Sequence, residues 1–308
     1  MSMPDLAVSV GPLKLKNPVL AASGTFGYGE EFSEIVSPDL LGGIVVKGLS
    51  LRPMPGNPPP RIVETPCGML NAIGLANVGL DAFVRDKLPY LERLDTAVIV
   101  NIYGHTIHEY GAVARGLRGI DAISALEVNV SCPNVESGGL AFGTDPDVSA
   151  QVTEAVAREA DKPVIVKLSP NVTDITSVAI AVERAGADIV SLINTLTGMS
   201  IDIEQRIPQL ANITGGLSGP AIRPVALYMV YRVVRAVHIP VIGIGGIMDY
   251  KDALEFLIAG AKAVQVGTAN FVDPGVCMKI IGGLTDFLKN HEINCIDEII
   301  GSLNDRMA

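Results

Sequence analysis

The chain has few cysteines, an excess of acidic over basic residues and no long apolar run. Its four cysteines are widely spaced and form no C-x-x-C pair; they are Cys67, Cys132, Cys277 and Cys295. This spacing argues against a disulfide framework and against a cysteine-bound metal or iron–sulfur cluster within the chain. The 23 basic and 33 acidic residues give a net charge of −10, which disfavours nucleic-acid binding because such proteins usually carry a basic stripe. No apolar run approaches the roughly 18 residues of a membrane span.

A secretion signal and a dinucleotide fingerprint are also missing. The N-terminal segment has no basic stretch followed by an apolar one, so we expect a cytoplasmic protein without a signal peptide. No predicted strand is followed by G-x-G-x-x-G, and the nearest match, at 243–248, has the wrong spacing. A doubly wound open sheet is therefore the less favoured of two candidate architectures.

Short apolar, β-branched segments recur along the chain, and each has Gly, Ser, Asn or Lys at or near its end. They are 18–24, 42–48, 96–104, 125–131, 163–169, 188–195, 239–246 and 263–269. Continuous rather than alternating hydrophobicity is typical of parallel strands buried on both faces. With helical patterns between most of them, the segments predict an α/β fold of the (β/α)8 TIM-barrel type. We find no repeat or linker, so 1–308 is expected to form a single domain.

Three helices are marked by their ends. Residues 145–160 open with Asp145-Pro146, an N-cap followed by proline at the first helical position. Residues 173–185 and 249–259 end before Gly186 and Gly260, which are C-cap signals. These helices alternate with the apolar segments, as a barrel requires.

Two long segments, 49–79 and 195–221, exceed what a minimal barrel needs. Both are rich in proline or glycine and follow predicted strands. Barrel active sites lie at the carboxyl ends of the strands, where these segments begin. Their aliphatic content argues against disorder, so we interpret them as long irregular loops that form lids or pocket walls.

Glycines follow the last two predicted strands, at Gly245-Gly246 and Gly267-Thr268. Barrels often bind phosphate at this place through backbone N–H groups, and glycine permits the close approach. Gly219 could join them from the segment 195–221. The alternative is that these glycines only turn the chain.

Lysine and asparagine side chains occur at the ends of other strands. Lys47 and Lys167 end strongly apolar segments, where a fixed cation could face an electron-rich cofactor or an anionic substrate. Both could instead extend to solvent at the barrel rim. Asn101, Asn129 and Asn194 offer paired donors and acceptors that suit a planar ligand, although single asparagines at strand ends are commonly structural.

Cys132 follows a strand directly and precedes Pro133. A free cysteine is most often a small buried hydrophobic residue, but this one lies in a polar loop, where a thiol could transfer a proton to or from a ligand. His105 and His108 have an H-x-x-H spacing, but no carboxylate or cysteine completes a metal site. We therefore expect no metal.

Taken together, these segments resemble the FMN-dependent dihydroorotate dehydrogenases of class 1, whose base is a cysteine. The resemblance runs almost end to end, through 22–29, 47–48, 71–79, 129–146, 166–171, 194–202, 215–224, 243–247 and 265–269. The sequence GGLAFGTDP at 138–146 is similar to the NAD-linked class 1B branch rather than the fumarate-linked 1A branch. Class 2 enzymes use a serine base and an N-terminal extension, and neither is found here.

The resemblance implies a role for each matched residue. FMN would be held by Ser23, Lys47, Gly48, Asn101, Asn129, Lys167, Ile193, Gly219, Gly245, Gly246, Gly267 and Thr268. Dihydroorotate would be held by Lys47, Asn71, Ala72, Ile73, Gly74, Leu75, Asn129, Asn134, Asn194 and Thr195. Cys132 would be the catalytic base, and Lys47 would act with it by stabilising negative charge.

The resemblance also implies a partner, because the chain has no site of its own for passing electrons to NAD⁺. A second subunit with FAD and a [2Fe–2S] cluster would do this in a heterotetramer of two catalytic and two electron-transfer subunits. A sibling flavin barrel is the main alternative, either a dihydropyrimidine dehydrogenase or a tRNA dihydrouridine synthase; the net charge disfavours the latter. A fumarate-linked dihydroorotate dehydrogenase and a barrel without flavin, acting only as a scaffold, are the others.

Overall fold

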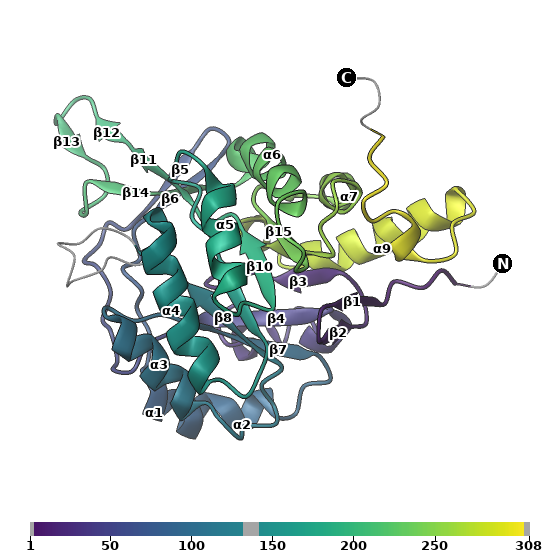
Figure 1. The fold of residues 1–308 in the computed structure, drawn as a ribbon. Coiled ribbons are helices and arrows are strands. Elements are labelled where there is room, and N and C mark those ends of the chain that lie inside the picture. The colour runs from purple at the N-terminus through teal and green to yellow at the C-terminus, as the bar shows by residue number, and fades with distance from the viewer. Residues whose placement is uncertain (1–2, 132–141, 305–308) are drawn as a thin grey trace.

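Eight parallel strands close into a barrel in the computed structural model, which describes residues 3–131 and 142–304 (Figure 1). Around the barrel their order is β10-β15-β16-β3-β4-β7-β8-β9. The bounds are β3 Val19–Ala21, β4 Gly43–Leu49, β7 Ala97–Ile102, β8 Ala125–Asn129, β9 Val164–Lys167, β10 Ile189–Leu192, β15 Val241–Ile244 and β16 Ala263–Val266. The predicted (β/α)8 barrel is confirmed, and every strand falls within a predicted apolar segment except β4, which extends one residue beyond its segment.

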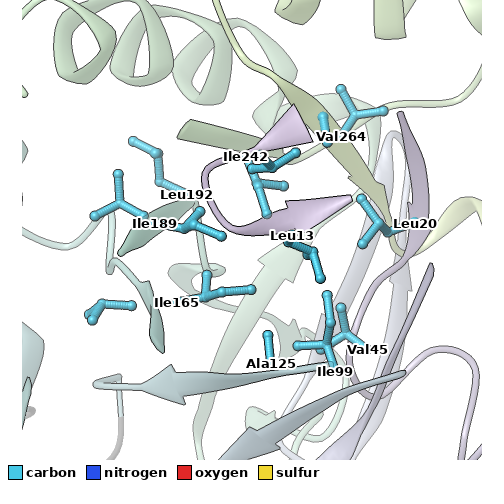
Figure 2. Packing of buried hydrophobic residues seen from close by; sticks show 14 of the residues in the cluster. Leu13, Leu20, Val45, Ile99, Ala125, Ile165, Ile189, Leu192, Ile242 and Val264 are labelled. Atoms are coloured by element: carbon cyan, nitrogen blue, oxygen red, sulfur yellow. The ribbon is translucent and has the colours of Figure 1, made fainter. Parts of the chain in front are cut away.

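The register of the strands places polar residues side by side inside the barrel. Asn101 lies opposite Glu127 between β7 and β8, and Asn129 lies opposite Lys167 between β8 and β9. Paired residues on adjacent strands project to the same face of a sheet. Most other positions of these strands are fully buried and aliphatic, and Figure 2 shows such side chains packed together, among them Ile99 and Ile165.

Helices surround the barrel (Figure 1). They are α1 Leu80–Ala82, α2 Leu88–Leu91, α3 Ile107–Gly116, α4 Pro146–Glu159, α5 Ile175–Arg184, α6 Arg223–Val234, α7 Tyr250–Ile258, α8 Ala269–Val272 and α9 Val276–Asn290, with a π-helical turn η3 Phe83–Lys87 joining α1 to α2. The three helices predicted from their ends are α4, α5 and α7. Asp145 caps α4 by accepting from two backbone N–H groups, at 2.8 and 3.1 Å. Within the described part of the chain, no helix is both long and apolar enough to cross a membrane.

A short antiparallel hairpin closes the amino-terminal end of the barrel. It consists of β1 Val8–Val10 and β2 Leu13–Leu15, whose outer residues are buried while the middle ones are exposed. Gly11 at its turn has a φ of +59°, and a Cβ there would lie 3.3 Å from Pro240 and 3.7 Å from Ile189, next to the beginnings of β15 and β10. The hairpin therefore packs against the strand beginnings, with Leu13 among the core side chains of Figure 2.

Parts of the segments 49–79 and 195–221 pair with each other, so these long loops are less irregular than predicted. They form an antiparallel sheet of order β11-β14-β6-β5, from β5 Ile62–Thr65, β6 Gly68–Asn71, β11 Leu196–Met199 and β14 Thr214–Ser218. The pairing of Leu217 with Leu70 joins the two segments. A further two-stranded ribbon, β12 Ile201–Asp202 and β13 Ile207–Pro208, projects away from the barrel (Figure 1).

Candidate active site

A cavity of about 540 Å³ lies at the carboxyl ends of the barrel strands. All eight strands contribute to it, either by their last residues or by the residues that follow, and the second sheet forms one wall through Met69 and Asn71. The volume is within the range of cavities that bind small molecules and cofactors. The sequence therefore places its polar strand ends in one site.

Every predicted site residue that the structure describes lines this cavity. The residues predicted to bind a cofactor are Ser23, Lys47, Gly48, Asn101, Asn129, Lys167, Ile193, Gly219, Gly245, Gly246, Gly267 and Thr268. Those predicted to bind the substrate, besides Lys47 and Asn129, are Asn71, Ala72, Ile73, Gly74, Leu75, Asn194 and Thr195. Cys132 and Asn134 lie outside the described residues. The ligand that each residue holds stays a prediction.

Lys47 brings a partly buried ammonium group to the cavity wall. Burial lowers the pKa of Lys47, the nearby charge of Arg61 lowers it further, and Glu31 acts in the opposite direction. Because the surroundings disfavour the charged form, an anion bound beside Lys47 would be stabilised by it and would in turn favour its protonation. The cavity is thus suited to a ligand with a negative group.

Asparagines from three parts of the chain are held by hydrogen bonds around the cavity. Asn194 donates to Asn129 Oδ1 at 3.1 Å, and the backbone N–H of Thr195 donates to Asn194 Oδ1 at 2.8 Å. Tyr110, on α3, donates to the carbonyl oxygen of Asn129 at 2.7 Å. Asn71 donates to the carbonyl oxygen of Gly216 at 3.3 Å. These contacts fix the amide groups in orientations suited to a planar polar ligand.

Glycine turns bring the backbone close to the cavity at Gly219, Gly245 and Gly246. Gly246 has a φ of +71°, and a Cβ there would lie 2.8 Å from both the nitrogen of Arg223 and the carbonyl oxygen of Gly219. Arg223 begins α6, so these turns meet the N-terminus of a helix of twelve residues. Exposed N–H groups of such an end, together with the helix dipole, suit a phosphate group.

Two serines also line the cavity. Ser218 Oγ accepts from the Thr268 hydroxyl at 2.8 Å, and both residues line the cavity. The Ser131 hydroxyl also lines it but is buried without a hydrogen-bond partner among the described residues. A buried hydroxyl normally has a partner. A ligand with polar groups would supply one.

Arg61 and Glu127 contribute to the site but were not predicted from the sequence. Arg61 lines the cavity, where it donates to the carbonyl oxygen of Asn57 at 3.3 Å. It lies in the segment 49–79, which was expected to form a pocket wall, and this expectation was the feature of the sequence that could have identified Arg61. Glu127 lies below the cavity and accepts from Asn101, a cavity residue, at 2.7 Å. The feature of the sequence that could have identified Glu127 is a charged residue in the middle of an apolar strand.

The cysteines in the described residues do not form a site. Burial raises the pKa of Cys277 to about 12, and its thiol donates to Asn270 Oδ1 at 3.4 Å, as expected of an unreactive structural cysteine. Cys67 is exposed and Cys295 is partly buried. In the part of the chain that the structure describes, no three His, Cys, Asp or Glu residues are arranged to hold a metal ion.

Comparison with known proteins gives a consistent result. Residues 5–288 match the family model described as dihydroorotate dehydrogenase. A protein of Geotalea daltonii is 59% identical over 303 residues, covering 98% of this chain and 99% of the relative. Similar proteins occur in Geobacter sulfurreducens, at 58% over 303 residues with the same coverage, and in Trichlorobacter lovleyi, at 59% over 300 residues covering 97% of this chain and 99% of the relative. All three carry the name dihydroorotate dehydrogenase B (NAD(+)), catalytic subunit.

Proposed function

The chain belongs to the dihydroorotate dehydrogenase family, and from this premise we propose that it is the catalytic subunit of an NAD-linked dihydroorotate dehydrogenase. It oxidises (S)-dihydroorotate to orotate, a step of de novo pyrimidine (UMP) synthesis. The observation that carries the proposal is the convergence of the matched lysines, asparagines and glycines on one cavity at the carboxyl ends of the barrel strands. This is where enzymes with this fold do their chemistry.

The cavity suits FMN as the cofactor. A phosphate group would fit the glycine turns that lie against the start of α6, at Gly219, Gly245 and Gly246. The Ser131 hydroxyl, which has no partner among the described residues, would fit a ligand with further polar groups. Asn101 and Lys167, at the ends of β7 and β9, would face the polar edge of a ring system. When bound, FMN supplies the acceptor, at its N5, for the hydride that leaves C6 of dihydroorotate.

The chain's own residues bind the substrate and move its proton. Lys47 would stabilise the carboxylate of the pyrimidine, whereas Lys167 would stabilise negative charge on the reduced cofactor. Asn71 to Leu75, Asn129, Asn134, Asn194 and Thr195 would orient the ring. Cys132 would take the proton from C5, so that one proton and one hydride leave adjacent carbons and the C5–C6 double bond forms.

The final oxidant requires a second protein. The sequence has neither a dinucleotide fingerprint nor the cysteine set of an iron–sulfur cluster, and its relatives are named as catalytic subunits. We propose a partner with FAD and a [2Fe–2S] cluster, in a heterotetramer of two subunits of each kind. The isolated, FMN-loaded chain should then oxidise dihydroorotate with an artificial dye and reduce NAD⁺ only slowly. Fast NAD⁺ reduction by the isolated chain would show that no partner subunit is needed for this step and would contradict the proposal.

The substrate can be tested against the main alternative, a dihydropyrimidine dehydrogenase. Dihydrouracil lacks the carboxylate that Lys47 is proposed to bind, so its kcat/KM should be lower than that of dihydroorotate by on the order of 10²-fold or more, as for sites whose polar group loses its partner. The measurement is dye reduction by the purified chain with each substrate in turn. Equal or faster turnover of dihydrouracil would favour the alternative.

A further inference from the structure

A glutamate with no exposed surface lies beneath the cavity. Glu127, on β8, accepts three hydrogen bonds with its carboxylate. Oε1 accepts from the Ser191 hydroxyl at 2.9 Å and from Gln265 Nε2 at 2.6 Å, while Oε2 accepts from Asn101 Nδ2 at 2.7 Å. The donors come from β10, β16 and β7, so the carboxylate joins strands across the interior of the barrel.

Lys167 is the fourth neighbour of this carboxylate. Its Nζ lies 3.8 Å from Glu127 Oε2, and the two side chains are 9% and 0% exposed. All four neighbours are donors, so a carboxylate can accept from each of them, whereas a glutamine would turn its own NH₂ group toward at least one donor. The site is therefore matched to a negative charge.

Packing alone does not require this cluster. Barrel interiors are normally filled by branched aliphatic residues, and a buried ion pair can often be replaced by apolar residues without loss of stability. Two of the neighbours, Asn101 and Lys167, line the cavity, but Glu127 does not. The cluster thus connects a buried negative charge to two groups that face the ligand.

We propose that Glu127 is a positioning residue that holds Lys167 and Asn101 toward the flavin and sets how strongly Lys167 favours the reduced cofactor. The inference rests on the proposed function, since it assumes that FMN occupies the cavity. The negative charge of Glu127 partly neutralises the ammonium group of Lys167. Without it, the lysine charge acts unopposed on the cofactor, and an anionic reduced flavin becomes more stable.

The test is the reduction potential of bound FMN in Glu127→Gln, measured by equilibration with reference dyes. We expect the equilibrium between oxidised and reduced flavin to shift about tenfold toward the reduced form, an increase of roughly 30 mV for a two-electron couple. In a Lys167→Met background the same substitution should have little effect, because the charge on which it acts is gone. This double-mutant cycle separates coupling through Lys167 from a general loss of structure.

Two further variants give a result even where a charge-removing variant fails to fold or to retain FMN. Glu127→Asp keeps the charge but withdraws it from Lys167, so the potential should rise by a smaller amount. Ser191→Ala removes one donor and keeps the charge in place, so the potential should stay at the wild-type value.

The outcomes separate this inference from the proposed function. If the wild-type chain holds no FMN, or holds FMN that dihydroorotate does not reduce, the proposed function itself fails. If the wild type is reduced normally, the inference is overturned by an unchanged potential in both Glu127 variants. It is equally overturned by a shift of the same size in the Lys167→Met background, or by one in Ser191→Ala as large as in Glu127→Asp.

Discussion

The two ends of the barrel are built from the same strands but differ in what they bury. At the amino-terminal end, the hairpin of β1 and β2 packs apolar side chains such as Leu13 and Leu15 against the core. At the carboxyl end, lysines, asparagines and glycines near or just beyond the strand ends line a cavity. The strand β8 shows the same change along its length, since it begins with the aliphatic Ala125 and Leu126 whereas its later residues include the polar Glu127 and Asn129.

This difference separates stability from chemistry along each strand. Apolar burial at the closed end contributes to the free energy of unfolding, whereas the half-buried Lys47 at the open end has a pKa shifted in the direction that burial of a cation imposes. Substitutions at the open end should therefore change catalysis more than stability, and those at the closed end should do the reverse.

The largest effect is expected from Cys132→Ala, at the residue predicted to be the catalytic base. If Cys132 is the base, its loss should lower kcat for dihydroorotate oxidation by about 10²- to 10⁴-fold, the usual contribution of general base catalysis. The control is Cys295→Ala. Cys295 pairs through an isolated backbone β-bridge with Asp5, which precedes the hairpin of the closed end. Stopped-flow measurement of flavin reduction gives both rates. A Cys132→Ala variant as fast as the wild type would remove the assignment of the base.

A substitution at the closed end should affect stability instead. Leu13 is 5% exposed, so Leu13→Ala should lower the free energy of unfolding by about 2–5 kcal/mol. The adjacent Lys14 is exposed, and Lys14→Ala should change the free energy of unfolding by less than about 0.5 kcal/mol. Denaturant unfolding measures both, and kcat per folded molecule should be unchanged in each. A loss of kcat in folded Leu13→Ala would contradict the separation of the two ends.

A smaller effect is expected from pH at the open end. Because burial and Arg61 lower the pKa of Lys47, this lysine loses its proton at a lower pH than an exposed lysine, whose pKa is about 10.4. The Kd of the product orotate should therefore rise several-fold between about pH 8 and about pH 10. Calorimetric titration of orotate measures it without involving the catalytic base. In Lys47→Arg the charge does not titrate in this range, so a rise of equal size in that variant would exclude Lys47 as its source.

The barrel could be predicted from the sequence because its signals are local. Each strand is a short apolar run, and the predicted helices carry their own caps, such as Asp145. The second sheet could not be predicted in this way. Its strands are short and partly exposed, and the pairing of Leu70 with Leu217 joins segments far apart in the chain. Nothing in either segment alone specifies the other as its partner.

The candidate site was predicted from the residue types at the strand ends. Such a prediction misses residues that lie beneath the cavity and contact the residues that line it. Glu127, Ser191 and Gln265 each interrupt an apolar strand. Each is buried, so each needs a hydrogen-bond partner. The sequence shows three such interruptions but not that they meet, because their distances depend on the closure of the barrel.

The proposed function is tested most directly by the absorbance spectrum of the purified chain, recorded anaerobically before and after addition of dihydroorotate. We predict a yellow protein with bound FMN whose flavin absorbance near the visible maximum is bleached on mixing, with no partner subunit present. Addition of dihydrouracil should leave the spectrum nearly unchanged. A colourless protein, or a flavin spectrum that dihydroorotate does not change, would contradict the proposal.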